Sequence, residues 1–118
     1  MHLIWKISDD VNRNDFQRDF LKYTAKGLLA ELKANYYDLF LQTKVSASDR
    51  AHQVWEKDSM YLDLYSDKFF NQKLDYIHHN PLQPHWNLAK YPEDYLWSSA
   101  SFYLKGDKRW GFLTHCDE

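Results

Sequence analysis

The sequence predicts an α+β fold in which a few short antiparallel strands pack on two main helices. Two long stretches, at about residues 14–35 and 66–80, have apolar side chains at helical spacing. Three short stretches, at 2–7, 53–57 and 60–65, are rich in aromatic and branched residues, as strands are. With three glycines, three prolines and no evident linker, the 118 residues are expected to form a single domain.

The helix expected at 14–35 follows the first strand after a polar loop and carries a basic stripe. Four cationic residues share one side of it: Arg18, Lys22, Lys26 and Lys33. Such a stripe can contact DNA phosphates, or it can be a plain solvated helix face. The formal net charge of −2 supplies no global attraction to nucleic acid, so any DNA binding must come from local patches of this kind.

The region between the two helices is expected to turn on the surface and then run as two short strands. Residues 44–50 are polar and suit a surface turn. The stretch 60–65 alternates between apolar and other side chains, which is the period of a strand.

The second helix has clear limits. Ser66 is a good N-cap with Asp67 in the first turn, and Pro81 disfavours helical geometry at the residue before it. One face of this helix is an apolar stripe. A second stripe, about a quarter-turn away, holds Phe69, Lys73, Tyr76 and Asn80.

Tyr76 therefore lies at the margin of the core with Asn80 beside it, four residues later. A tyrosine with a lysine and an asparagine along one helix edge suits a nucleophile for phosphodiester chemistry. The alternative is a partly buried aromatic side chain with its hydroxyl in water. His78 points nearly opposite to Asn80 and His79 faces away from the core, so the geometry favours Asn80 over the histidine pair as a functional neighbour.

Beyond Pro81 the chain is expected to be a loop-rich tail. A short helix at about 98–103 should end near Gly106. Aromatic residues of this tail could stack on unpaired bases or pack as ordinary core. They are Trp86, Tyr95, Trp97, Tyr103 and Trp110.

Three runs of the sequence carry a family resemblance: QKLDYIHHNPL at 72–82, YPEDYLWSSASFY at 91–103 and WGFLTH at 110–115. They resemble the C-terminal half of the REP-associated tyrosine transposases, a branch of the single-tyrosine HUH transposases of bacterial insertion sequences. The resemblance spans essentially the whole chain. It implies a partial ferredoxin-like fold, binding of single-stranded hairpin DNA, and DNA strand cleavage and rejoining in transposition.

The resemblance also implies roles for individual residues. Tyr76 matches the tyrosine that attacks DNA to leave a 5′-phosphotyrosine link, and His2 matches the second histidine of the metal-binding pair. His2 and Asn80 would then hold Mg²⁺ or Mn²⁺, and Lys73 would assist the charge of the phosphate or leaving group. A tyrosine hydroxyl is a weak nucleophile at neutral pH, so the reaction depends on such an ion.

The first histidine of that pair would lie before residue 1, so the chain is expected to be an N-terminally truncated domain. Residues 1–80 would be the remnant of the catalytic domain and 81–118 its tail. Truncation exposes apolar surface and predicts self-association, for example as a homodimer. Besides an active enzyme, two alternatives follow: an inactive remnant that only binds DNA, and a domain with no DNA function.

Other classes of site and location are excluded or disfavoured by the sequence. Cys116 has no partner for an internal disulfide, and no apolar run is long enough for a membrane span, so a cytoplasmic protein is expected. Nucleotide-binding glycine loops and zinc-protease motifs are absent. His52, His85 and His115 are too scattered to specify a metal site and are expected to be surface or capping residues.

Overall fold

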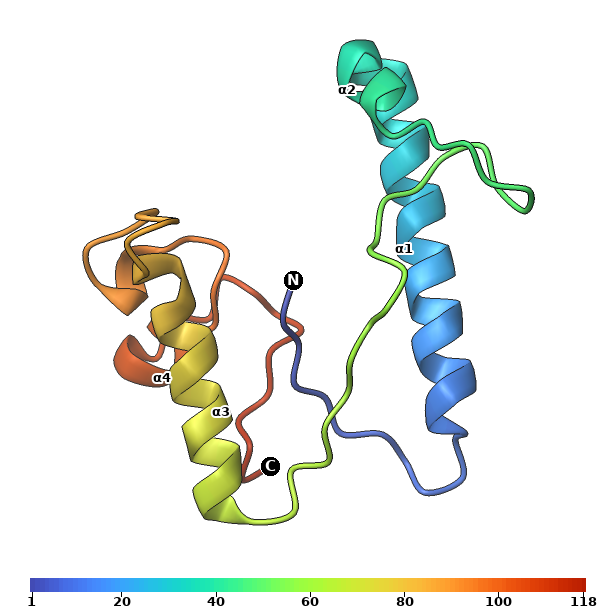
Figure 1. Cartoon of the computed structure of the whole chain (residues 1–118). Coiled ribbons are helices and arrows are strands. Elements are labelled where there is room, and N and C mark those ends of the chain that lie inside the picture. Colours follow the sequence, from blue (N-terminus) through green and yellow to red (C-terminus); the bar gives the residue numbers. More distant parts are fainter. The chain divides into compact units, whose positions relative to one another are not determined.

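The computed structural model describes residues 1–118. Its regular secondary structure consists of helices and one isolated β-bridge (Figure 1). Helices hold 46% of the residues and isolated bridge residues 2%. The elements in chain order are α1 (Arg13–Asn35), α2 (Tyr37–Gln42), α3 (Asp67–His79), the short 3₁₀ helices η1 (Asn80–Leu82) and η2 (Pro92–Asp94), and α4 (Ala100–Lys105).

The prediction of an α+β, ferredoxin-like fold is therefore wrong, because the chain contains no sheet. The stretches expected as strands at 2–7, 53–57 and 60–65 are extended or irregular and have no strand partner. No backbone–backbone hydrogen bond outside helices involves residues 54–65. An alternating pattern makes a strand only when a second segment pairs with its N–H and C=O groups, and none does so here.

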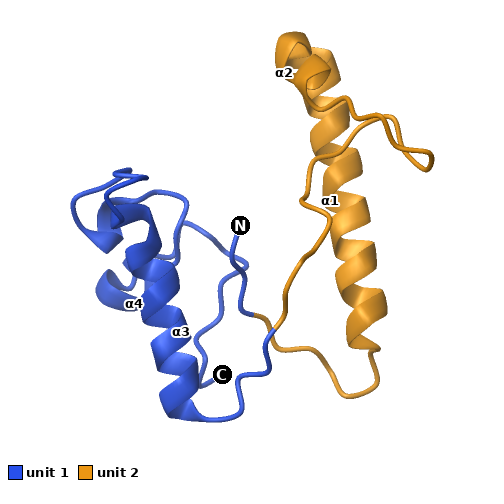
Figure 2. Cartoon of the chain, viewed as in Figure 1, with its two compact units in different colours: residues 1–4, 62–118 blue, residues 5–61 orange.

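The chain divides into two compact units, each described here by itself (Figure 2). Unit 1 comprises Met1–Ile4 and Leu62–Glu118, and unit 2 comprises Trp5–Tyr61.

Unit 2 is built on α1, whose predicted extent is confirmed. The Asn12 side chain caps its first turn by accepting a hydrogen bond from the Asp15 N–H at 3.1 Å. Trp5 packs edge-on against Phe16 and Phe20, with ring centroids 5.0 and 5.2 Å away. No residue of α1 is fully buried.

The rest of unit 2 folds back along α1 after α2. Residues 44–52 make the predicted surface turn, closed by an antiparallel bridge between Lys44 and His52. The Trp55 indole N–H then donates to Thr24 Oγ1 of α1 at 3.0 Å. This bond fixes the segment after the turn to the helix, where the sequence had suggested a paired strand.

Unit 1 is organised by α3, which begins and ends where the sequence predicts. The Ser66 hydroxyl accepts the Phe69 N–H at 3.2 Å, and the helix passes into η1 at Asn80. The short helix α4 confirms the prediction of a helix near 98–103, with Gly106 at its C-cap. His78 on α3 joins the two helices, because its Nε2 lies 2.9 Å from Ser99 Oγ, just before α4.

Burial is sparse and concentrated in unit 1. The four buried residues are His78, Pro81, Ala100 and Ser101. Many large apolar side chains are exposed in both units, Met60, Tyr65 and Tyr23 by 80% or more. None of the helices has the length and apolar character needed to cross a bilayer.

Two glycines give predictions of opposite sign. Gly27 lies inside α1 with nothing within 4 Å of an added Cβ, so Gly27→Ala should raise the free energy of unfolding by about 0.5–1 kcal/mol.

Gly106 ends α4 with φ of 67°, so Gly106→Ala should lower the free energy of unfolding by about 1 kcal/mol. Urea unfolding followed by circular dichroism measures both, and a destabilising Gly27→Ala would contradict the exposed position of Gly27.

His78 predicts a stability that falls in mild acid. Burial lowers the pKa of His78 below its usual 6.5, with a smaller opposing effect of Asp75. As the pH falls below about 6.5, the unfolded chain takes up a proton that the folded chain binds less well, so the free energy of unfolding decreases. Thermal melts at pH 7.5 and 5.5 in metal-free buffer should show this loss, and His78→Gln should reduce it. The exposed neighbour His79→Gln is the matched control, and an equal effect of both variants would exclude His78 as the cause.

Candidate active site

The end of α3 places Tyr76 and Asn80 side by side, as their spacing predicts. Asn80 is the C-cap of the helix, and its side-chain Nδ2 lies 3.4 Å from the Tyr76 hydroxyl, a long hydrogen bond. The Asn80 backbone N–H donates to the Tyr76 carbonyl in the same turn. Tyr76 is 53% exposed, so about half of the residue is open to solvent.

The N-terminal segment brings His2 to the same tyrosine. The His2 ring meets the Tyr76 ring edge-on, with centroids 5.7 Å apart and planes at 83°. His2, Tyr76 and Asn80 therefore lie around one pocket of about 490 Å³. The structure thus brings together the catalytic residue and both metal ligands expected from the sequence.

The loop after η1 completes the pocket with Gln83, His85 and Trp86. The Gln83 carbonyl accepts the N–H groups of Trp86 and Asn87 at 2.9 and 2.8 Å, which makes a tight turn. Asn87 has φ of 46°, and the next N–H, of Leu88, donates to the Pro81 carbonyl at 2.9 Å. The loop is thereby folded back to the end of α3.

The six lining side chains are two imidazoles, two amides, one phenol and one indole, with no carboxylate and no lysine or arginine. The Asn80 nitrogen faces the Tyr76 hydroxyl, and Asn80 Oδ1 has no hydrogen-bond partner in the chain. The pocket therefore offers imidazole and amide nitrogen and oxygen atoms around the Tyr76 side chain. These donors fit a divalent ion that accepts imidazole and amide ligands.

The neighbouring histidines of α3 take no part, as the helix geometry predicts. His78 is buried against Ser99 and Tyr103 on another face. His79 is exposed, and its Nδ1 lies 2.9 Å from the Asp75 carbonyl oxygen.

Lys73 is not brought to the pocket. Lys73 precedes Tyr76 by about one helical turn, and its ammonium lies over the Phe69 ring, 5.2 Å from the centroid.

The four basic residues predicted on α1 belong to unit 2. Arg18, Lys22 and Lys26 line a groove there, and Lys33, in the last turn of α1, does not.

Sequence reasoning missed Gln83 and His85, and treated Trp86 only as a base-stacking or core candidate. The sequence feature that could have identified them is their closeness to the end of the second helix. All three follow Pro81 within five residues, and Pro84 lies among them. A proline-rich stretch so close to a helix end favours a turn that returns to that end.

One further group could hold a metal ion. The ligand atoms of His115, Cys116 and Asp117 lie within 4.8 Å of one another. These residues are adjacent in sequence near the C-terminal end and mostly exposed, so their grouping follows from adjacency. His115 also packs against Tyr103, with centroids 4.9 Å apart.

Comparison with known protein families, curated proteins and solved structures found no match to this chain. The resemblance to the REP-associated tyrosine transposases therefore remains a prediction carried by the sequence runs and by the residues around Tyr76.

Proposed function

We propose that unit 1 binds single-stranded hairpin DNA and cleaves and rejoins it through Tyr76, as expected of a transposase of the family that the sequence resembles. One observation supports the proposal above all: His2, Tyr76 and Asn80, assigned from sequence to one reaction, line one pocket. His2 and Tyr76 are 74 positions apart in the 118-residue chain, so helix spacing does not account for that meeting.

The proposed reaction is an in-line displacement at a DNA phosphate. The Tyr76 oxygen attacks phosphorus and loses its proton to water, and the bond from phosphorus to the 3′ oxygen breaks. The departing oxygen takes up a proton to become a free 3′-hydroxyl, and the 5′ phosphate stays on Tyr76. Attack by a 3′-hydroxyl on this link reverses the step and rejoins the strand.

The pocket around Tyr76 is as large as an ordinary small-ligand site and has an exposed aromatic side chain at its edge. Its volume of about 490 Å³ lies within the roughly 300–1,000 Å³ usual for small-ligand sites. The exposed Trp86 indole beside His85 offers a surface on which an unpaired base can stack.

A divalent ion would supply charge stabilisation at the phosphate when bound. His2 and Asn80 are its proposed ligands, and His85 and Gln83 are the further donors around the same space. Mg²⁺ and Mn²⁺ both favour oxygen ligands, and in the absence of a carboxylate the amide oxygens of Asn80 and Gln83 are the ones that this pocket can offer. The proposal also places the protein in the cytoplasm, where its one exposed, free cysteine would stay reduced.

Tyr76→Phe is predicted to abolish the covalent protein–DNA adduct while leaving DNA binding nearly intact. The variant removes only the attacking oxygen, and Asn80 loses one long hydrogen bond. A denaturing gel with a labelled hairpin oligonucleotide and Mn²⁺ or Mg²⁺ detects the adduct, and a native gel detects binding.

Tyr103→Phe is the matched control, because Tyr103 lies beside His78 and His115, away from the pocket. Equal adduct formation by Tyr76→Phe would rule out Tyr76 as the nucleophile. Binding by the unchanged protein without any adduct would instead identify a DNA-binding protein that does not cleave.

Mn²⁺ added below stoichiometry is predicted to broaden the NMR signals of the His2 and His85 ring protons first. Paramagnetic broadening falls steeply with distance, so the order of broadening locates the ion. His85→Gln should raise the Mn²⁺ concentration needed at His2, whereas His79→Gln should not, since His79 is bonded to its own helix. Broadening centred on His115 would place the ion at the C-terminal group instead.

A further inference from the structure

Unit 2 carries a groove of about 740 Å³ between α1 and the segment at 50–61 that folds back along it. We infer that this groove is a second binding site for single-stranded DNA, with Lys22, Lys26 and Lys57 on phosphates and Tyr61 against a base. The choice of DNA as the ligand rests on the function proposed for Tyr76. The groove itself is lined only by residues of unit 2 and does not depend on that function.

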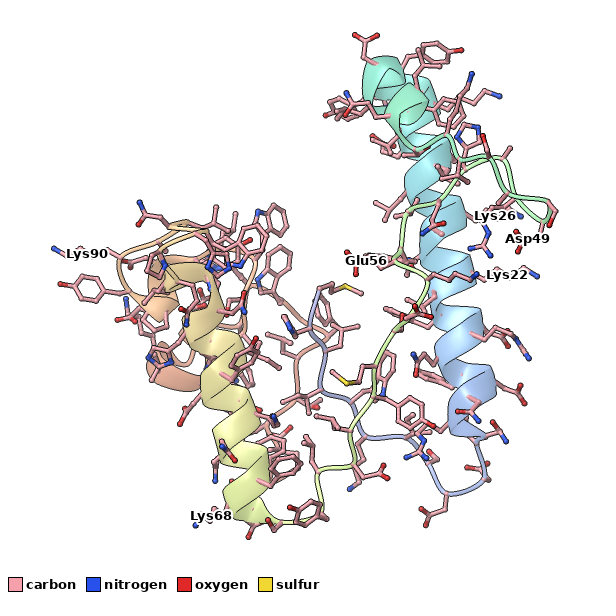
Figure 3. All side chains as sticks on the ribbon, in the orientation of Figure 1. Lys22, Lys26, Asp49, Glu56, Lys68 and Lys90 are labelled. Carbon is pink, nitrogen blue, oxygen red and sulfur yellow. The ribbon has the colours of Figure 1, made fainter.

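The side chains that line the groove are mostly cationic, and the carboxylates that offset them lie outside its lining. Five cationic side chains line it and only one carboxylate, that of Glu56. In Figure 3, Lys22 and Lys26 extend from the same side of α1, and Glu56 extends from its segment in the opposite direction. The whole chain carries a formal charge of −2, so this is a local concentration of positive charge.

The two arginines of the groove are already engaged by carboxylates. Arg18 is paired with Asp15 at 2.8 Å and Asp19 at 3.0 Å, and Arg50 with Asp49 at 2.6 Å. These partners raise the pKa of both guanidinium groups. None of the three lysines has a carboxylate within ion-pair distance, although Lys57 lies near enough to Asp49 to help lower the pKa of that carboxyl. Their ammonium groups are therefore the cations of the groove that are most available to phosphates.

Aromatic side chains make the groove suited to unpaired bases. Tyr61 is 50% exposed and is held by the Arg13 guanidinium, 4.5 Å from its ring centroid. Trp55 is fixed to α1 through its bond to Thr24. Lysines that track a backbone beside an aromatic platform are the usual means of binding single strands, whose bases are free to stack.

The test is the affinity of a fluorescein-labelled hairpin oligonucleotide with unpaired flanks, measured by anisotropy at several salt concentrations. The parent protein carries Tyr76→Phe, so that no covalent step contributes to binding. Replacing Lys22, Lys26 and Lys57 by Gln together should weaken binding about ten- to hundredfold at 0.1 M salt. The slope of log affinity against log salt should fall by about 2, since each single-strand phosphate contact contributes about 0.7.

The matched control replaces Lys44, Lys68 and Lys90 by Gln together. These three lysines are exposed and lie outside the groove, and the change in net charge is the same. Little loss in this control supports the groove. Equal losses in the two triple variants, or no loss in either, would overturn the inference, as would failure of the parent to bind the oligonucleotide.

A second variant separates a site for DNA from a site for any polyanion. Tyr61→Leu should weaken oligonucleotide binding about fivefold or more and leave inorganic polyphosphate binding unchanged, because polyphosphate has no bases to stack. Equal responses of the two ligands would overturn the base contact. An unmodified chain that forms no adduct but shows the lysine effect would refute the function proposed for Tyr76 and leave the groove site standing.

Discussion

The stop of α3 at Asn80 and Pro81 is the constraint on which the candidate site depends. Proline has no N–H and restricts the residue before it, so the helix passes into η1 and the chain turns back. Asn80 is left as the cap beside Tyr76, and the bond from Leu88 to the Pro81 carbonyl returns the following loop to the helix end. Five of the six pocket residues follow from this one stop, because they all lie within ten positions of one another: Tyr76, Asn80, Gln83, His85 and Trp86.

The helices were predictable because their signals are local. Ser66 caps α3, the apolar spacing gives the length of α1, and Gly106 ends α4, each through residues a few positions apart. The strands were not predictable in the same way. The alternation at 60–65 is real, but a strand exists only if a distant segment meets its backbone, and a short-range pattern carries no information about that segment.

The same difference between local and long-range contacts decides which parts of the candidate site could be predicted. Tyr76 and Asn80 are neighbours by helix spacing alone, so their contact could be predicted. The place of His2 came from a family resemblance, since no periodicity links residues so far apart in sequence. Gln83 and His85 lie in a turn whose path depends on backbone hydrogen bonds within the loop and to η1. Lys73 lies over Phe69, its neighbour four residues earlier on the same stripe, and not beside Tyr76.

The location of the buried residues also sets which part of the chain opens first. All four lie at the end of α3 or the start of α4, whereas α1 has none. Local opening is easiest where little apolar surface is lost to water, so backbone amides in α1 should exchange with solvent hydrogen through small, frequent fluctuations. The last turn of α3 would exchange most slowly. Tyr76 is thus anchored in the most persistent part of unit 1, and a substrate would meet a helix end that is already in place.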